Sequence, residues 1–176
     1  MIPRKVWAIM LAAVTLISLG TGEIACHYVD TEVSSVIYTS GGIPLLWKQT
    51  SMEDYASGTA TGTDVTSYPG DIMLQPSETG SFTSAVFDTG KAGTIFDHAF
   101  WDRILPAGTS IIVEVRANDT LSGGVPNDAW EDLGDGTHAS LEGLTGRYVQ
   151  WRAVLTSEVL GETPVLEEVR LYYRLA

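Results

Sequence analysis

The sequence predicts an all-β protein, built as an antiparallel two-sheet β-sandwich and preceded by an N-terminal hydrophobic helix. Two observations predict the sandwich. Turn signals made of Gly, Pro, Asp and Thr recur at short, regular intervals from Tyr68 to the C-terminus. The runs between these turns alternate apolar and polar residues, which is typical of strands with one buried face and one wet face. Two such sheets, packed face to face, would bury their apolar rows.

The N-terminal helix is predicted by a short basic head followed by an uncharged apolar run. Arg4 and Lys5 form the head, and residues 6–20 form the run. This order, with small residues after the run, is typical of a signal peptide that is cleaved after Gly22. The apolar run is shorter than the roughly 20 residues that a membrane-spanning helix needs. Retention as a membrane anchor is therefore the alternative and cleavage the main interpretation. Residues 1–22 are therefore interpreted as a signal peptide or a membrane anchor.

Cys26 offers a third fate for the N-terminal segment. Ala25, just before it, is the small residue that a lipidation site needs, but Glu23 stands where such sites usually carry Leu. Lipidation of Cys26 therefore stays open beside cleavage and retention. All three fates predict that the remainder of the chain is extracellular, at the cell surface or periplasmic, either secreted or membrane-anchored.

The rest of the chain divides into a neck and a sandwich. Residues 23–46 are interpreted as a neck or linker with one short candidate strand at residues 33–38. Residues 47–176 are assigned to the β-sandwich domain. Within that domain, residues 50–67 are so rich in Thr, Ser and Gly that composition alone would make them a linker.

The clearest strands place their apolar residues in three rows. These rows are Ile111, Val113 and Val115; Val149, Trp151, Ala153 and Leu155; and Val169, Leu171 and Tyr173. Trp101 and Trp151 lie in alternating strands and are expected in the core. His98 is expected to share a strand face with Phe96 and Phe100, and His138 to lie in a solvated loop. No convincing amphipathic helix follows the N-terminal segment.

Several segments stand out in order along the chain: GSFTSAVFDTG at residues 80–90, PAGTSIIVEVR at 106–116, GRYVQWR at 146–152, and an ending with TPVL at 163–166 and VRLY at 169–172. Together they resemble a jelly-roll-like β-sandwich module of secreted and cell-surface archaeal and bacterial proteins. The resemblance covers about residues 47–176, and it implies that residues 50–67 belong to the domain. It implies a fold of the laminin-G, discoidin or carbohydrate-binding type, although a fold alone does not determine a function.

Charge and motif content exclude several classes of function. The chain has 10 Lys and Arg against 22 Asp and Glu, which gives a net charge of -12. A nucleic-acid backbone needs a basic stripe, so nucleic acid is excluded as a partner. The single cysteine excludes an internal disulfide and a four-cysteine zinc site. A nucleophile elbow, a zinc-protease motif and a phosphate-binding loop are all missing, so the sequence predicts that the protein is not an enzyme.

Two groups of residues are candidates for binding. Trp47 and Trp130 lie near strand ends or loops and are candidates for a surface platform that binds a glycan. The most acidic loop offers four oxygen ligands for Ca²⁺, the one cofactor that the sequence suggests: Asp128, Glu131, Asp132 and Asp135. The alternative for this loop is a solvated turn with Trp130 against the sheet. Asn118 begins an N-x-T sequon and is a candidate glycosylation site.

These features predict an exported, non-catalytic β-sandwich that acts as an extracellular binding or adhesion module at or near the cell surface. Its partner would be a glycan or a surface protein, and it would touch the membrane only through an uncleaved or lipidated N-terminal segment. The alternative is a structural subunit of a cell-envelope layer or an extracellular filament, in which the chain self-assembles by adding a strand to a neighbour's sheet edge.

Overall fold

The structure, a computed structural model, describes residues 17–19, 23–25, 43–76 and 78–176. The chain forms two units, Met1–Ile43 and Pro44–Ala176. In the first unit, β1 (Ile17–Leu19) pairs antiparallel with β2 (Glu23–Ala25).

The described part of the expected N-terminal helix is therefore a strand, because Ile17–Leu19 belongs to β1. The rest of that expected helix lies outside the described residues, as do Cys26 and the candidate strand at residues 33–38. No helix in the described ranges is both long and apolar enough to cross a membrane.

The second unit is a sandwich of two sheets, and every strand pair described in it is antiparallel, so the predicted antiparallel two-sheet β-sandwich is confirmed. Sheet I has the order β13–β10–β15–β7–β4, and β8 also pairs with β15. Its strands are β13 (Glu131–Asp132), β10 (Thr109–Asn118), β15 (Tyr148–Ser157), β7 (Thr79–Thr83), β4 (Thr59–Thr61) and β8 (Phe87–Asp88). Sheet II has the order β14–β9–β16–β6–β5, and β3 also pairs with β16. Its strands are β14 (His138–Ser140), β9 (Ile95–Ile104), β16 (Val165–Arg174), β6 (Ile72–Leu74), β5 (Thr63–Asp64) and β3 (Leu45–Gln49).

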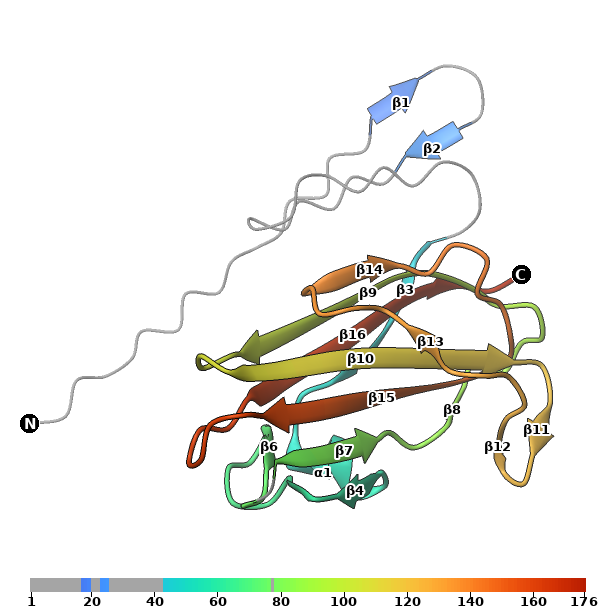
Figure 1. Cartoon of the computed structure of the whole chain (residues 1–176). Coiled ribbons are helices and arrows are strands. Elements are labelled where there is room, and N and C mark those ends of the chain that lie inside the picture. Colours follow the sequence, from blue (N-terminus) through green and yellow to red (C-terminus); the bar gives the residue numbers. More distant parts are fainter. Residues whose placement is uncertain (1–16, 20–22, 26–42, 77) are drawn as a thin grey trace, which may run out of the picture. The chain divides into compact units, whose positions relative to one another are not determined.

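The chain crosses repeatedly between the two sheets, as in a jelly-roll-like sandwich (Figure 1). From β8 onward it visits sheet I, sheet II and sheet I again in β8, β9 and β10. It then runs from β13 in sheet I through β14, β15 and β16, changing sheet at every step. A small hairpin of β11 (Leu121–Ser122) and β12 (Val125–Pro126) stands outside both sheets.

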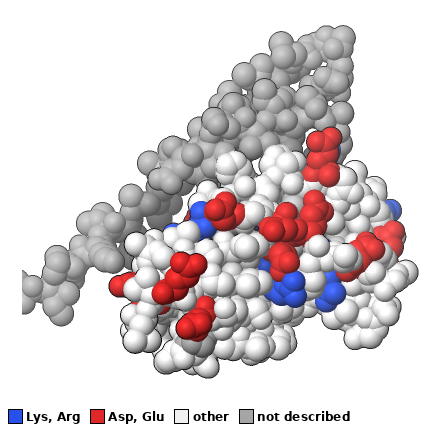
Figure 2. All heavy atoms as spheres, viewed as in Figure 1, with Lys and Arg blue, Asp and Glu red and all other residues white. Residues whose placement is uncertain are grey.

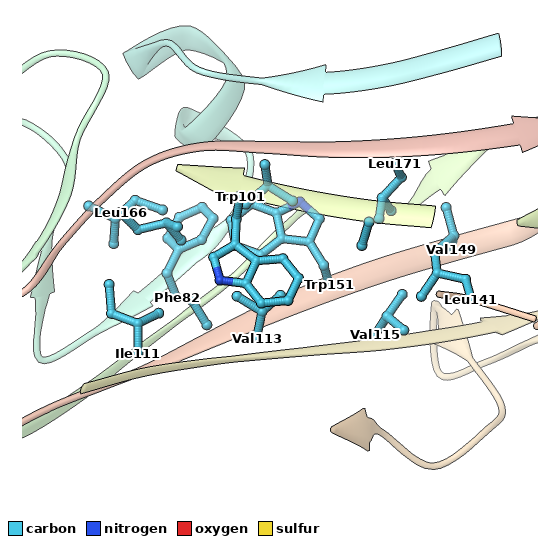
Figure 3. Close-up of a cluster of buried hydrophobic side chains, with 14 of the residues drawn as sticks. Phe82, Trp101, Ile111, Val113, Val115, Leu141, Val149, Trp151, Leu166 and Leu171 are labelled. Carbon is cyan, nitrogen blue, oxygen red and sulfur yellow. The ribbon is translucent and has the colours of Figure 1, made fainter. Parts of the chain in front are cut away.

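The core lies between the two sheets and contains the three predicted apolar rows. Every residue of those rows is at most 8% exposed. Trp101 of β9 and Trp151 of β15 come from opposite sheets, and both belong to the cluster of buried side chains between them (Figure 3). They are 0% and 1% exposed, so the prediction that both are core residues is confirmed. The polar residues that alternate with the rows cover the outer faces of the sheets.

Residues 50–67 belong to the sandwich, as the resemblance implied. Gly62 separates β4 of sheet I from β5 of sheet II, and its φ of 66° is the left-handed backbone that only glycine adopts freely. Gly80 on β7 lets this turn come close, because a Cβ there would lie 2.4 Å from the Gly62 carbonyl oxygen.

The same region contains a short helix that the sequence analysis missed. The helix is α1 (Met52–Ala56), and it begins with a capping box. The Ser51 hydroxyl accepts a hydrogen bond from the Asp54 amide, while the Asp54 carboxylate accepts one from the Ser51 amide. This local exchange starts a single turn that is too short to show an amphipathic period.

The expectation that His98 shares a strand face with Phe96 and Phe100 is right for Phe100 and wrong for Phe96, because β9 contains a bulge. Its register with β16 shifts between Tyr172, which pairs with His98, and Tyr173, which pairs with Phe96. Asp97 is the extra residue, and one extra residue reverses the faces on either side of it. Phe96 is therefore 1% exposed in the core, whereas His98 lies with Phe100 on the outer face of sheet II.

His138 was also expected elsewhere, in a solvated loop. It lies in β14, where it is exposed and pairs with Phe100 of β9.

Candidate functional site

Trp130 lies at the outer face of sheet I, directly before β13. The pairing of Glu131 with the inward-facing Val115 of β10 places Trp130 beside the next residue of β10, Arg116. The guanidinium carbon of Arg116 lies 4.2 Å from the centroid of the indole ring, and that of Arg152 on β15 lies 4.7 Å from it. Two cation–π contacts therefore hold one half-buried indole.

The two arginines meet because of the register between β10 and β15. Glu114 pairs with Arg152, and Arg116 pairs with Gln150, so the arginines are diagonal neighbours on the outer face. Each sits at a polar position of an alternating strand, with buried residues on both sides of it along the chain. Alternation thus points both guanidiniums to the same surface.

Each guanidinium is fixed by a second partner. Arg152 forms an ion pair with Glu114. The Nε and Nη2 atoms of Arg116 donate to the side-chain oxygen of Gln150, at 3.1 and 2.6 Å. Gln150 is 6% exposed, and its own amide donates to the Ser84 carbonyl at 2.7 Å. These contacts fix both guanidiniums next to the indole to neighbouring residues of sheet I.

Arg116 and Arg152 place two positive charges side by side, which is unusual in so acidic a chain. Burial lowers the pKa of Arg116, and the nearby positive charge of Arg152 lowers it further. Arg152 is balanced by Glu114, but Arg116 has no ion pair with a carboxylate in the described part of the chain. The negative face of the indole offsets part of the repulsion between the two cations.

Polar groups surround the Trp130 platform, the name we give to the Trp130 indole together with Arg116 and Arg152. Figure 2 shows acidic and basic side chains gathered over β10, β13 and β15. Asp132, two residues after Trp130 and paired with Glu114 of the outer face, is exposed, and Asn118 at the end of β10 donates a hydrogen bond to Asp128 at 3.0 Å. The arrangement offers a flat apolar ring with hydrogen-bonding groups around it, which suits a ligand with both apolar faces and hydroxyl groups.

Trp47, the other tryptophan predicted for a surface platform, lies elsewhere. It belongs to β3 of sheet II, where its ring stacks on Phe87 of β8 with centroids 4.8 Å apart and planes 8° apart. Both rings pack against the core cluster. The structure therefore does not bring Trp47 and Trp130 together, and Trp47 joins the edges of the two sheets.

The four acids predicted to bind calcium do not form a common site. Asp128 accepts a hydrogen bond from Asn118, Asp132 accepts one from the Gly134 amide, and Glu131 and Asp135 are exposed. Over the described ranges, no three His, Cys, Asp or Glu side chains are grouped as metal ligands.

Asn118, the predicted glycosylation site, is held at both ends of its side-chain amide. Its oxygen accepts hydrogen bonds from the backbone amide and the hydroxyl of Thr120, both at 2.8 Å. Its nitrogen, the atom to which a sugar would be attached, donates a hydrogen bond to Asp128.

Arg116 and Arg152 were not among the site residues predicted from the sequence. A signal was present, since both are long cationic side chains at wet-face positions of two strongly alternating strands. What the sequence does not show is the register that brings them to the same indole.

Comparisons with known proteins concern the fold. No protein-family model matches the sequence, and no curated protein matches it. Among solved structures, the chain is similar to the CBM35 module from Paenibacillus barcinonensis, with 15% identity and a TM-score of 0.41, covering 72% of this chain and 97% of that one. It is also similar to CBM86, a low-affinity xylan-binding module from Roseburia intestinalis, with 10% identity and a TM-score of 0.41, covering 76% and 97%.

A third similar structure is the GH29 fucosidase of Ruminococcus gnavus, with 16% identity and a TM-score of 0.41. The match covers 70% of this chain but only 26% of the fucosidase. At such distances the likeness identifies neither a ligand nor an activity for this chain.

Proposed function

We propose that the chain is an exported, non-catalytic binding module that holds a glycan at or near the cell surface. The observation that carries the proposal is the Trp130 indole, fixed on the outer face of sheet I by the guanidiniums of Arg116 and Arg152. A sugar ring has an apolar C–H face that stacks on such an indole, and hydroxyl groups that need polar partners around it.

The rigidity of the platform supports binding rather than packing. A ligand that stacks on a fixed aromatic ring loses less free energy to ordering of side chains than one that must order them itself. Both arginines under Trp130 are held by their own partners, Glu114 and Gln150, so the ring is already placed. The exposed Asp132, on the same face as Trp130, supplies an acceptor for sugar hydroxyl groups.

The test is a glycan array followed by titration calorimetry on the best ligand. We expect Trp130→Ala to weaken binding by about tenfold or more, which corresponds to about 1.4 kcal/mol. Tyr68→Ala is the matched control, because Tyr68 is a 61% exposed aromatic residue away from this platform. Circular dichroism of each variant checks that the sandwich is folded.

Two results would contradict the proposal. One is a folded wild-type chain that binds no glycan on the array. The other is a Trp130→Ala variant that binds as tightly as the wild type, which would remove the indole from the site.

A further inference from the structure

The outer face of sheet II carries two rows of side chains that cross four strands in register. The first row is His138, Phe100, Arg170 and Lys48, and the second is Ser140, His98, Tyr172 and Leu46. Each step within a row is one strand spacing of about 4.8 Å, so a row spans about 14 Å. We call the surface formed by Phe100, His98, His138 and Tyr172 the aromatic face.

Phe100 is the centre of the aromatic face. The rings of His138 and His98 lie 5.9 and 6.3 Å from the Phe100 ring, with planes only 21° and 28° from parallel. The Tyr172 ring meets it edge-on at 5.6 Å, and the guanidinium of Arg170 lies over it at 5.8 Å. Polar strand faces normally carry single aromatic residues, so four rings in contact form a distinct surface.

The charges on this face are neutralised within the face itself. Arg170 pairs with Asp102 at 3.2 Å and with Glu168 at 2.8 Å. Lys48 pairs with the same Glu168 at 2.6 Å. A ligand therefore meets aromatic rings bordered by closed ion pairs, which favours an uncharged ligand over an anion or a cation.

The kinds of side chain in the two rows restrict the class of ligand further. Leu46 is the only aliphatic residue in the two rows, so the face lacks the broad apolar area of a protein–protein core. In each row two rings lie side by side next to polar side chains, Arg170 and Lys48 in the first row and Ser140 in the second. A sugar chain likewise has apolar C–H faces bordered by hydroxyl groups. An uncharged glycan chain lying across the strands fits both features.

We propose that the aromatic face is a second binding face, for an uncharged glycan chain, on the opposite side of the sandwich from Trp130. The core separates the two faces, since sheet I and sheet II contribute their buried rows to it from opposite sides. The module then holds two chains at once and bridges them. The bridging rests on the proposed function at Trp130, whereas binding at the aromatic face does not.

The test compares wild type, Phe100→Thr, Trp130→Ala and the double variant, with a soluble neutral xylan and a soluble neutral β-glucan as probes. Calorimetry with short oligosaccharides of each probe counts the binding sites, and light scattering of the long polysaccharide reports bridging. We expect two sites and scattering aggregates for the wild type. Each single variant should keep one site and form no aggregates, and the double variant should bind nothing.

The outcomes separate the two proposals. If Phe100→Thr keeps two sites and still aggregates the polysaccharide, the aromatic face is overturned and the Trp130 site stands. If Trp130→Ala keeps full binding while Phe100→Thr loses it, the aromatic face stands, and the Trp130 site and bridging are overturned. A wild type that binds neither probe overturns the second face.

A second variant keeps the test valid if Phe100→Thr does not fold. His138 is exposed on the edge strand β14, so His138→Ala removes a ring from the aromatic face at small risk to the core. We expect it to weaken the second site about tenfold, with Tyr68→Ala unchanged. Binding at this face should also be unaffected by added salt, and a strong salt dependence would contradict an uncharged ligand.

Discussion

Two buried tryptophans differ in how their indole nitrogens are satisfied. The Trp151 Nε1 donates to the side-chain oxygen of Gln49 at 2.7 Å, and this bond links β15 of sheet I to β3 of sheet II. The Trp101 Nε1 is buried with no hydrogen-bond partner among the described residues. A buried polar atom without a partner costs free energy, so Trp101 contributes packing alone while Trp151 also contributes a polar link between the sheets.

Removing that link should destabilise the sandwich. Gln49 is 6% exposed, and its amide also donates to the Asp54 carbonyl at 3.0 Å. We expect Gln49→Leu to lower the free energy of unfolding by about 1–3 kcal/mol, because the Trp151 Nε1 would be left buried and unpaired. Urea unfolding followed by tryptophan fluorescence measures the change. The exposed Gln75 gives the control, Gln75→Leu, which should change stability by less than about 0.5 kcal/mol. Equal effects of the two substitutions would show that the buried hydrogen bond does not stabilise the fold.

Among the elements, the two-residue strand β8 depends on contacts outside the β-ladder. It pairs with only the first residues of β15. Asp88 accepts hydrogen bonds from the Nε and Nη2 atoms of Arg147, at 2.7 and 2.8 Å, and from the Gly90 amide at 2.8 Å. Asp119 accepts from the Arg147 and Gly93 amides. Two carboxylates thus hold three connecting segments at one end of the sandwich.

This arrangement predicts a pH dependence. The Arg147 guanidinium, and then the Gly90 amide, lower the pKa of Asp88 from 3.8 to about 2. Because the folded value lies below the unfolded one, the stabilisation is complete above about pH 4 and is lost as the pH falls toward 2. The stability difference between wild type and Asp88→Asn should therefore be present at pH 7 and shrink steadily as the pH falls from about 4 to 2, as measured by urea unfolding at several pH values.

The effect of Asp88→Asn should be small, because the ion pair is exposed to solvent. Asp135→Asn is the control, since it removes the same charge from an exposed loop. A difference between wild type and Asp88→Asn that persists unchanged to pH 2 would mean that the ion pair does not hold β8.

At the scale of the whole molecule, the sequence predicts the layers better than the contacts between them. The row Ile111, Val113 and Val115 could be assigned to the core because alternation is a local property of one strand. The bulge at Asp97 could not be predicted in this way, since no feature of the sequence marks which residue of β9 is left unpaired. It is visible only in the pairing with β16, and it moves His98 to the outer face.

The candidate site shows the same division between local and long-range information. Trp130 stands out in the sequence as an aromatic residue in a polar loop, and the alternative reading of that loop already placed it against the sheet. Its contacts with Arg116 and Arg152 depend on two registers, of β13 with β10 and of β10 with β15. Such pairings join residues far apart in the chain, so they need the assembled sheet.

The last prediction concerns the N-terminal segment and the sandwich together. Among the described residues, the core cluster runs from Tyr55 to Tyr173 and lies within the second unit, Pro44–Ala176. A recombinant chain that begins at Glu23 should therefore unfold in urea at the same midpoint, and with the same slope, as the full chain.

Export predicts in addition that the intact mass of the native protein corresponds to a chain beginning at Glu23. A native chain in the membrane fraction whose mass includes Met1, or a lipid on Cys26, would show that the N-terminal segment is an anchor and not a cleaved signal peptide. A full-length native chain in the cytoplasmic fraction would contradict export.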